Sequence, residues 1–166
     1  MKNIFCAGLY IFMAFLSFGQ DTQKSSNMKS APTILFICEH GAARSTIAAA
    51  YFNKLAQQQG LNYHAIFRGT NPDSVLTPAA QRGLIKDSFD VQGWKPVQVT
   101  KSDIENAYQV VTLDCLLPDK DNITKPITQW EGIPPVSSDY NVARDAIVKK
   151  VQALIVDLSL KHNITK

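Results

Sequence analysis

Residues 33 to 55 join a short apolar segment to an amphipathic segment through a loop that contains a cysteine and an arginine. Residues 34 to 37 form a continuous apolar run, which is typical of a strand buried in a parallel sheet. Beyond Ser45 the sequence is rich in alanine, and apolar residues recur at helical spacing as far as Gly60, which suits a helix cap. These apolar positions are Ala48, Tyr51, Phe52, Leu55 and Ala56. The segment therefore predicts a strand, a loop and a helix, with the loop at the helix N-terminus.

The position of this loop determines its chemistry. Backbone N–H groups at a helix N-terminus lack partners within the helix, so they can surround a tetrahedral anion. A thiol placed there beside an arginine ionises readily and becomes a nucleophile, which is the role predicted for Cys38. The guanidinium of Arg44 can hold two phosphoryl oxygens, and a positive charge in the first helical turn needs an anionic partner. The alternative is a buried core cysteine beside a solvated arginine.

The rest of the chain continues the alternation of strand and helix patterns. This alternation predicts an α/β fold, a doubly wound sheet of about four parallel strands with its site at the carboxyl edge. A long C-terminal helix is expected to bury Ala143, Ile147, Val151, Leu154 and Leu158.

At the loop the chain resembles the low-molecular-weight protein tyrosine phosphatases and the related thioredoxin-coupled arsenate reductases. The resemblance runs from about Pro32 to Leu160 and implies a three-layer sandwich of the phosphotyrosine protein phosphatase I type. Four segments carry it beyond the loop: 62 to 69 as second strand, 77 to 86 as helix, 95 to 105 leading to the third strand, and 110 to 114 as that strand with its terminal acid.

The resemblance also assigns the loop residues. It implies that Cys38 is the nucleophile and Arg44 the phosphoryl-binding arginine. Six further residues would bind substrate: Glu39, His40, Gly41, Ala42, Ala43 and Ser45. Gly41 replaces an asparagine that usually braces the family loop, and Ala43 replaces a second cysteine found in many phosphatases. His40 could hydrogen-bond the loop, tune Cys38 or face solvent, and Ser45 could donate to the sulfur or cap the helix.

The general acid is the largest departure. Family members place an aspartate, usually before a proline, on a late loop to protonate the leaving oxygen. Residues 130 to 139 contain no such pair, and the nearest carboxylate is Asp139. Asp139 is therefore the predicted acid, with helix capping as the alternative, and Glu131 is a weaker candidate.

The N-terminus predicts export. Lys2 precedes an apolar run that ends in small residues, which is typical of a signal peptide over residues 1 to 19. The apolar run is too short for a stable membrane anchor. Residues 20 to 31 form a polar linker, and residues 32 to 166 form the catalytic domain. The expected location is secreted or periplasmic, or cytoplasmic if translation starts at Met28.

Charge and cysteine content limit the partners. The formal net charge of +3 comes with no basic run, so nucleic acid is not expected, and no His/Cys cluster predicts a metal or cofactor. Cys115 follows the third strand at the edge expected to hold Cys38. It is a possible redox partner in an oxidising compartment, or a half-buried loop thiol.

These patterns support three functions. The first is an exported phosphatase that hydrolyses phosphate monoesters, such as phosphotyrosine or small aryl phosphates, through a thiophosphate intermediate. The second is an arsenate reductase with a cysteine relay and a thiol reductant, and the third is an oxyanion-binding protein without catalysis. Trp94, Trp130 and Tyr140 could line an aryl site, although packing is the more ordinary role for aromatic residues.

Overall fold

The computed structural model describes residues 30–117 and 123–164, and side chains as far as Lys161. The elements are β1 (Thr33–Cys38), α1 (Arg44–Gln58), β2 (His64–Gly69), α2 (Pro78–Lys86), α3 (Lys101–Asn106), β3 (Gln109–Leu113), β4 (Ile127–Trp130) and α4 (Tyr140–Ile164). All strand pairs are parallel, in the order β2-β1-β3-β4. The predicted α/β fold with a four-stranded parallel sheet is confirmed. The expected signal peptide, residues 1 to 19, lies outside the described residues, as does the linker apart from its last two positions.

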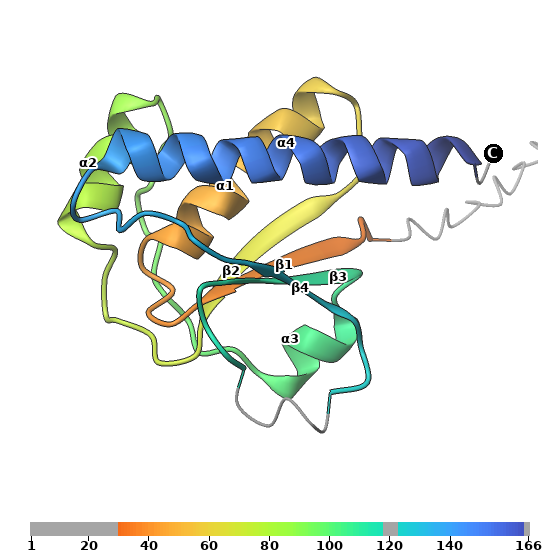
Figure 1. The fold of residues 1–166 in the computed structure, drawn as a ribbon, viewed down its shortest axis with the longest axis horizontal. Coiled ribbons are helices and arrows are strands. Elements are labelled where there is room, and N and C mark those ends of the chain that lie inside the picture. The colour runs from red at the N-terminus through yellow and green to blue at the C-terminus, as the bar shows by residue number, and fades with distance from the viewer. Residues whose placement is uncertain (1–29, 118–122, 165–166) are drawn as a thin grey trace, which may run out of the picture.

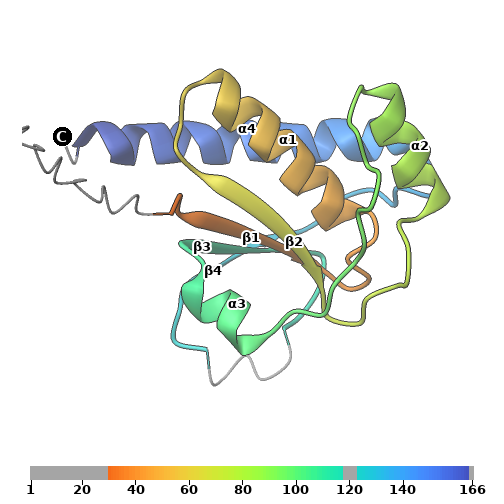
Figure 2. The ribbon, with the colours of Figure 1, turned by 180° about the vertical axis from the view of Figure 1, so that it is seen from behind.

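The central strand β1 lies between two layers of helices, one on each face of the sheet. Ile34 to Ile37 are fully buried because β1 pairs with β2 on one side and β3 on the other, and helices cover both faces. Side chains alternate along a strand, so Phe36 and Cys38 pack on the face covered by α1 and α4, whereas Ile37 packs on the face covered by α3. Figures 1 and 2 show α1 and α4 on one side of the sheet and α3 on the other.

The long helix α4 buries the stripe predicted from its spacing. Ala143, Ile147, Val151, Leu154 and Leu158 are at most 8% exposed and belong to one apolar cluster with α1. The predicted second strand, the helix after it and the third strand also form, within two residues of their expected starts. No helix in the described part of the chain combines the length and apolar character needed to cross a membrane.

The strand order creates a crevice at the carboxyl edge. From β1 the chain passes through α1 to β2 on one side, and β3 and β4 lie on the other side of β1. The loops that follow β1 and β3 therefore diverge at neighbouring positions, the place where doubly wound sheets bind ligands. The Cys38 loop lies at this crevice.

A polar cluster connects α1, the end of α2 and α4. The Asp87 carboxylate accepts hydrogen bonds from Tyr51 (2.7 Å) and Tyr140 (2.6 Å), and it forms an ion pair with Arg144 at 3.2 Å. Partial burial alone would raise the pKa of Asp87, but the bonds from Tyr140, Tyr51 and Arg144 hold this pKa below its ordinary value. Partial burial and the bond to Asp87 raise the pKa of Tyr51 to about 12.

This cluster predicts acid sensitivity. Because the pKa of Asp87 is lower in the folded state, its contribution is present above the unfolded-state pKa and is lost as pH falls through the folded-state pKa. Asp87→Asn should lower the free energy of unfolding by about 2 kcal/mol at pH 7, and the difference from wild type should shrink in acid. Urea unfolding of both proteins at pH 7 and pH 3 measures this difference in the free energy of unfolding. An equal difference at both pH values would contradict the ionised role of Asp87.

Candidate functional site

The loop between β1 and α1 turns its carbonyl groups away from its own centre. Six consecutive carbonyls accept hydrogen bonds: Cys38 from Thr70 N (3.1 Å), Glu39 from Asn71 N (2.8 Å), His40 from Asp73 N (3.1 Å), Gly41 from Thr46 Oγ1 (2.8 Å), Ala42 from Thr77 N (3.0 Å) and Ala43 from Ile47 N (2.9 Å). In the described chain, the N–H groups of residues 39 to 46 donate to no protein acceptor. Eight adjacent N–H groups are therefore free for an anion at a helix N-terminus.

A close approach to the end of β2 fixes the loop path. Gly41 has φ +61°, and a Cβ atom there would lie 2.9 Å from Gly69 N. A Cβ atom on Gly69 would likewise lie 2.9 Å from Gly41 N. Gly41 stands where the family resemblance predicts a bracing asparagine. Here the loop is held instead by the six hydrogen bonds that its carbonyl groups accept, including the one from Thr46 to Gly41.

The thiol of Cys38 lies at the base of the loop, 5% exposed, with Sγ 3.1 Å from Ser45 Oγ. The Ser45 hydroxyl also donates to the Arg68 carbonyl at 3.3 Å. The N-cap residue of α1 is Ala43, whose side chain makes no capping hydrogen bond. Ser45 therefore contacts the Cys38 sulfur and does not cap the helix. A thiol can donate to Ser45, whereas a thiolate can accept the Ser45 hydrogen once the hydroxyl turns from Arg68.

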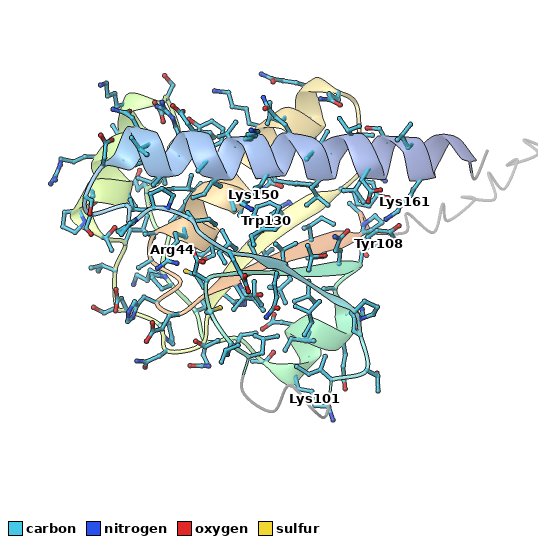
Figure 3. The ribbon with its side chains drawn as sticks, in the orientation of Figure 1. Arg44, Lys101, Tyr108, Trp130, Lys150 and Lys161 are labelled. Carbon is cyan, nitrogen blue, oxygen red and sulfur yellow. The ribbon has the colours of Figure 1, made fainter. Side chains whose placement is uncertain are left out.

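Arg44 is held by the carboxylate of Asp114, the residue that follows β3. Its Nη1 donates to Asp114 Oδ2 at 2.9 Å, and Asp114 also accepts from Gly132 N (2.8 Å) and Ile133 N (3.0 Å). No other acceptor for Arg44 lies within the described residues, so the rest of its guanidinium fork remains available. Figure 3 shows Arg44 at the loop end of the sheet. Sequence reasoning missed this role of Asp114, which also adopts a left-handed φ of +46°.

The loop opens into a small hollow of about 170 Å³. It is lined by Cys38, Glu39, His40, Ala42, Ala43, Arg44, Thr77, Pro135, Val136 and Ser137. The structure thus brings most of the predicted loop residues together, while Gly41 and Ser45 support the loop from outside this lining.

The predicted acid does not line this hollow. Asp139 Oδ1 accepts from Asn141 N (2.8 Å) and Val142 N (3.2 Å), the arrangement of a helix cap at the start of α4. Pro135 and Val136 occupy the late-loop wall of the hollow instead. Glu131 lines a different, larger hollow of about 700 Å³, together with Asp114 and Cys115, and Glu39 lines both hollows.

Cys115 lies near Cys38 but on the opposite face of the sheet. Its thiol donates to the Ile37 carbonyl at 3.5 Å, and it packs with the apolar cluster under α3. Burial, and next the negative charge of Cys38, raise the pKa of Cys115 to about 11. At neutral pH Cys115 is therefore a protonated and poorly nucleophilic thiol.

This placement predicts that Cys115 is no resolving thiol. After brief peroxide treatment, the fraction of activity recovered with dithiothreitol should be the same in wild type and Cys115→Ala, within about twofold. Mass spectrometry of the oxidised, unreduced protein should find no link between Cys38 and Cys115. A Cys38–Cys115 disulfide, or recovery confined to wild type, would contradict this expectation.

The three aromatic residues have packing roles. Trp130 is 7% exposed and stacks at a tilt on Phe36, with ring centroids 5.5 Å apart. Trp94 packs on Phe67, and the Tyr140 hydroxyl binds Asp87. Among the described residues, no Phe, Tyr or Trp contributes to the lining of the 170 Å³ hollow.

The sequence of the chain matches one protein family. Residues 33–125 match the family model described as low molecular weight phosphotyrosine protein phosphatase. No curated protein is found to be significantly similar to the chain.

Solved structures share the fold at low sequence identity. YfkJ from Bacillus subtilis superposes with a TM-score of 0.68 at 18% identity over 81% of this chain and 98% of its own. The YwlE arginine phosphatase from Geobacillus stearothermophilus gives 0.68 at 19% identity over 81% and 97%. An arsenate reductase from Archaeoglobus fulgidus gives 0.60 at 26% identity over 74% and 98%.

Proposed function

Because the chain belongs to the low molecular weight phosphotyrosine protein phosphatase family, we propose that it is a cysteine-dependent phosphatase that hydrolyses phosphate monoesters. One observation carries this proposal. The eight N–H groups that follow Cys38 in the described chain have no protein acceptor, and Cys38 and Arg44 line the same hollow. Phosphotyrosine and small aryl phosphates are the proposed substrates, and no cofactor is required.

The geometry suggests a two-step reaction. The Cys38 thiolate attacks phosphorus in line, the P–O bond to the leaving group breaks, and a thiophosphate forms on sulfur. The amides of residues 39 to 46 and Arg44 stabilise the charge on the equatorial oxygens. Water then attacks phosphorus, the P–S bond breaks, and phosphate leaves.

Asp114 prepares Arg44 for this role. Its carboxylate is fixed by two backbone N–H groups beyond β4, so one end of the guanidinium is immobilised before substrate arrives. A fixed guanidinium loses little side-chain freedom on binding an oxyanion, which favours the transition state.

A second candidate is an arsenate reductase, because arsenate reductases are among the solved structures that share the fold. The same loop would bind arsenate. A relay from Cys38 to Cys115 is disfavoured, since the two thiols lie on opposite faces of the sheet and burial raises the pKa of Cys115. A third candidate, an oxyanion-binding protein without turnover, would leave Cys38 unused.

Assays of the purified protein separate these candidates. A phosphatase should hydrolyse an aryl phosphate and leave arsenate unreduced in the presence of a thiol reductant. Reduction of arsenate faster than phosphate release would favour the reductase. Tight binding of phosphate without either reaction would favour the binding protein.

The role of Asp139 is tested with two leaving groups. If Asp139 were the acid, Asp139→Asn would slow hydrolysis of phenyl phosphate far more than that of an activated nitrophenyl ester. Because its carboxylate caps α4, we expect equal, small rate losses on both esters and a loss of about 1 kcal/mol in stability. A loss confined to phenyl phosphate would assign Asp139 to catalysis.

We also propose export to a periplasmic or extracellular location, supported by the signal-like sequence of residues 1 to 19. Determining the N-terminus of the protein from its native cells tests this. An intact N-terminus, or one at Met28, would exclude cleavage after residue 19.

A further inference from the structure

Neither late-loop carboxylate, Asp139 or Glu131, is among the described residues that line the hollow at Cys38. If neither acts as the acid, the proton donor belongs to another part of the site. In the described chain, the ionisable side chains that line the hollow belong to the loop itself: Cys38, Glu39, His40 and Arg44. Cys38 is the proposed nucleophile and Arg44 the oxyanion ligand. Glu39 and His40 remain as candidate proton donors.

His40 is positioned by Asp73, a residue of the loop after β2. The backbone N–H of Asp73 binds the His40 carbonyl at 3.1 Å, and its Oδ1 lies 3.4 Å from His40 Nδ1. The same residue therefore fixes the main chain and the ring of His40. The other ring nitrogen, Nε2, is 3.8 Å from Glu39 Oε2, beyond ordinary hydrogen-bond length. The side chain is 52% exposed, as expected at the mouth of a hollow.

The carboxylates of the region are less suited to donating a proton. Asp114 accepts from Arg44 and from two backbone N–H groups, so it serves as a fixed anion. Asp139 caps α4, and Glu131 lines the larger hollow. Glu39 is 62% exposed, and its carboxylate lies 3.8 Å from His40 Nε2, so no short hydrogen bond to the ring fixes its position. Histidine is the side chain that ordinarily changes charge between pH 5 and 8.

We propose that His40, positioned by Asp73, is the general acid and base of the phosphatase reaction, a role that rests on the function proposed above. In the first step the P–O bond breaks and the leaving oxygen takes a proton from the His40 imidazolium. In the second step neutral His40 removes a proton from the water that attacks phosphorus, and the P–S electron pair returns to Cys38. His40 is then protonated again, so the cycle needs no other reactant.

The leaving group decides how much this proton matters, because an activated aryl oxide departs without protonation. His40→Asn should lower kcat/KM for phenyl phosphate by about 100-fold or more, within the range of general acid catalysis. For 2,4-dinitrophenyl phosphate the loss should stay below about fivefold. Asp73→Asn should show the same selectivity with a smaller loss of about tenfold, because the ring remains but its position is no longer fixed.

The pH profile gives a second readout. The charged groups facing the ring are the Asp73 and Glu39 carboxylates, with Cys38 and Arg44 in the same hollow. The alkaline decline of kcat for phenyl phosphate should disappear in His40→Asn, because there is then no imidazolium to lose. His64→Asn is the matched control, an exposed histidine at the start of β2 outside the hollow, and should behave as wild type.

Several outcomes would overturn the assignment. Equal losses on both esters in His40→Asn, with vanadate binding retained, would make His40 a structural residue of the loop. Wild-type rates on phenyl phosphate, or leaving-group selectivity in Glu131→Gln instead, would place the acid elsewhere. If His40→Asn binds no vanadate, His40→Gln repeats the comparison with a longer amide. If wild type fails to hydrolyse the dinitrophenyl ester, the proposed function itself fails, and the role of His40 fails with it.

Discussion

Replacing Cys38 with serine should abolish turnover of aryl phosphates while the protein continues to bind phosphate or vanadate. A serine hydroxyl does not ionise near neutral pH, so the nucleophile is lost and kcat should fall by roughly four orders of magnitude or more. The eight N–H groups and Arg44 do not depend on the sulfur, because the loop carbonyls hold their conformation. Anion affinity should therefore stay within about threefold of wild type.

Steady-state kinetics with an aryl phosphate and calorimetric titration with vanadate measure the two effects separately. Cys115→Ser is the matched control, since it makes the same atomic change in a partly buried thiol that faces the α3 side of the sheet. Activity of Cys38→Ser within tenfold of wild type would exclude a thiolate nucleophile. Loss of vanadate binding with a wild-type melting curve would show that the sulfur itself holds the anion.

The strand, loop and helix around Cys38 were predictable because their signals are local. The apolar run of residues 34 to 37 is buried on both faces, and the helix begins at Arg44, two residues before the start predicted after Ser45. Free N–H groups follow directly from a loop at a helix N-terminus. The alternation of strands and helices and the inner stripe of α4 also follow from periodicity. The positions of the second strand, the helix after it and the third strand were expected from the family resemblance.

Other features depend on contacts that distant residues make. The strand β4 has only four residues, two of them exposed, and α3 has six, so neither produces a long periodic pattern. The bond between Arg44 and Asp114 joins residues 70 positions apart. The use of Asp139 as a cap was one of two alternatives that sequence left open. The hydrogen bonds from Asn141 N and Val142 N to its carboxylate favour the cap, and the Asp139→Asn comparison tests it.

Arg44→Lys should weaken both turnover and anion binding, even though it keeps the positive charge. A lysine ammonium can still pair with Asp114, so the melting temperature should change little. It cannot, however, hold Asp114 and two phosphoryl oxygens at once in the planar geometry of a guanidinium. The expected loss is about 2 to 4 kcal/mol of transition-state stabilisation, comparable with removal of other oxyanion donors.

The comparison with Cys38→Ser makes this test specific, because the two variants should separate in vanadate affinity. Cys38→Ser should keep vanadate affinity and lose turnover, whereas Arg44→Lys should lower both vanadate affinity and turnover. Arg82→Lys, an exposed arginine on α2, controls for the substitution itself. If Arg44→Lys binds vanadate as wild type does and retains kcat/KM within threefold, Arg44 serves mainly to neutralise Asp114. The anion would then be held by the backbone N–H groups alone, which the carbonyl bonds of the loop leave free.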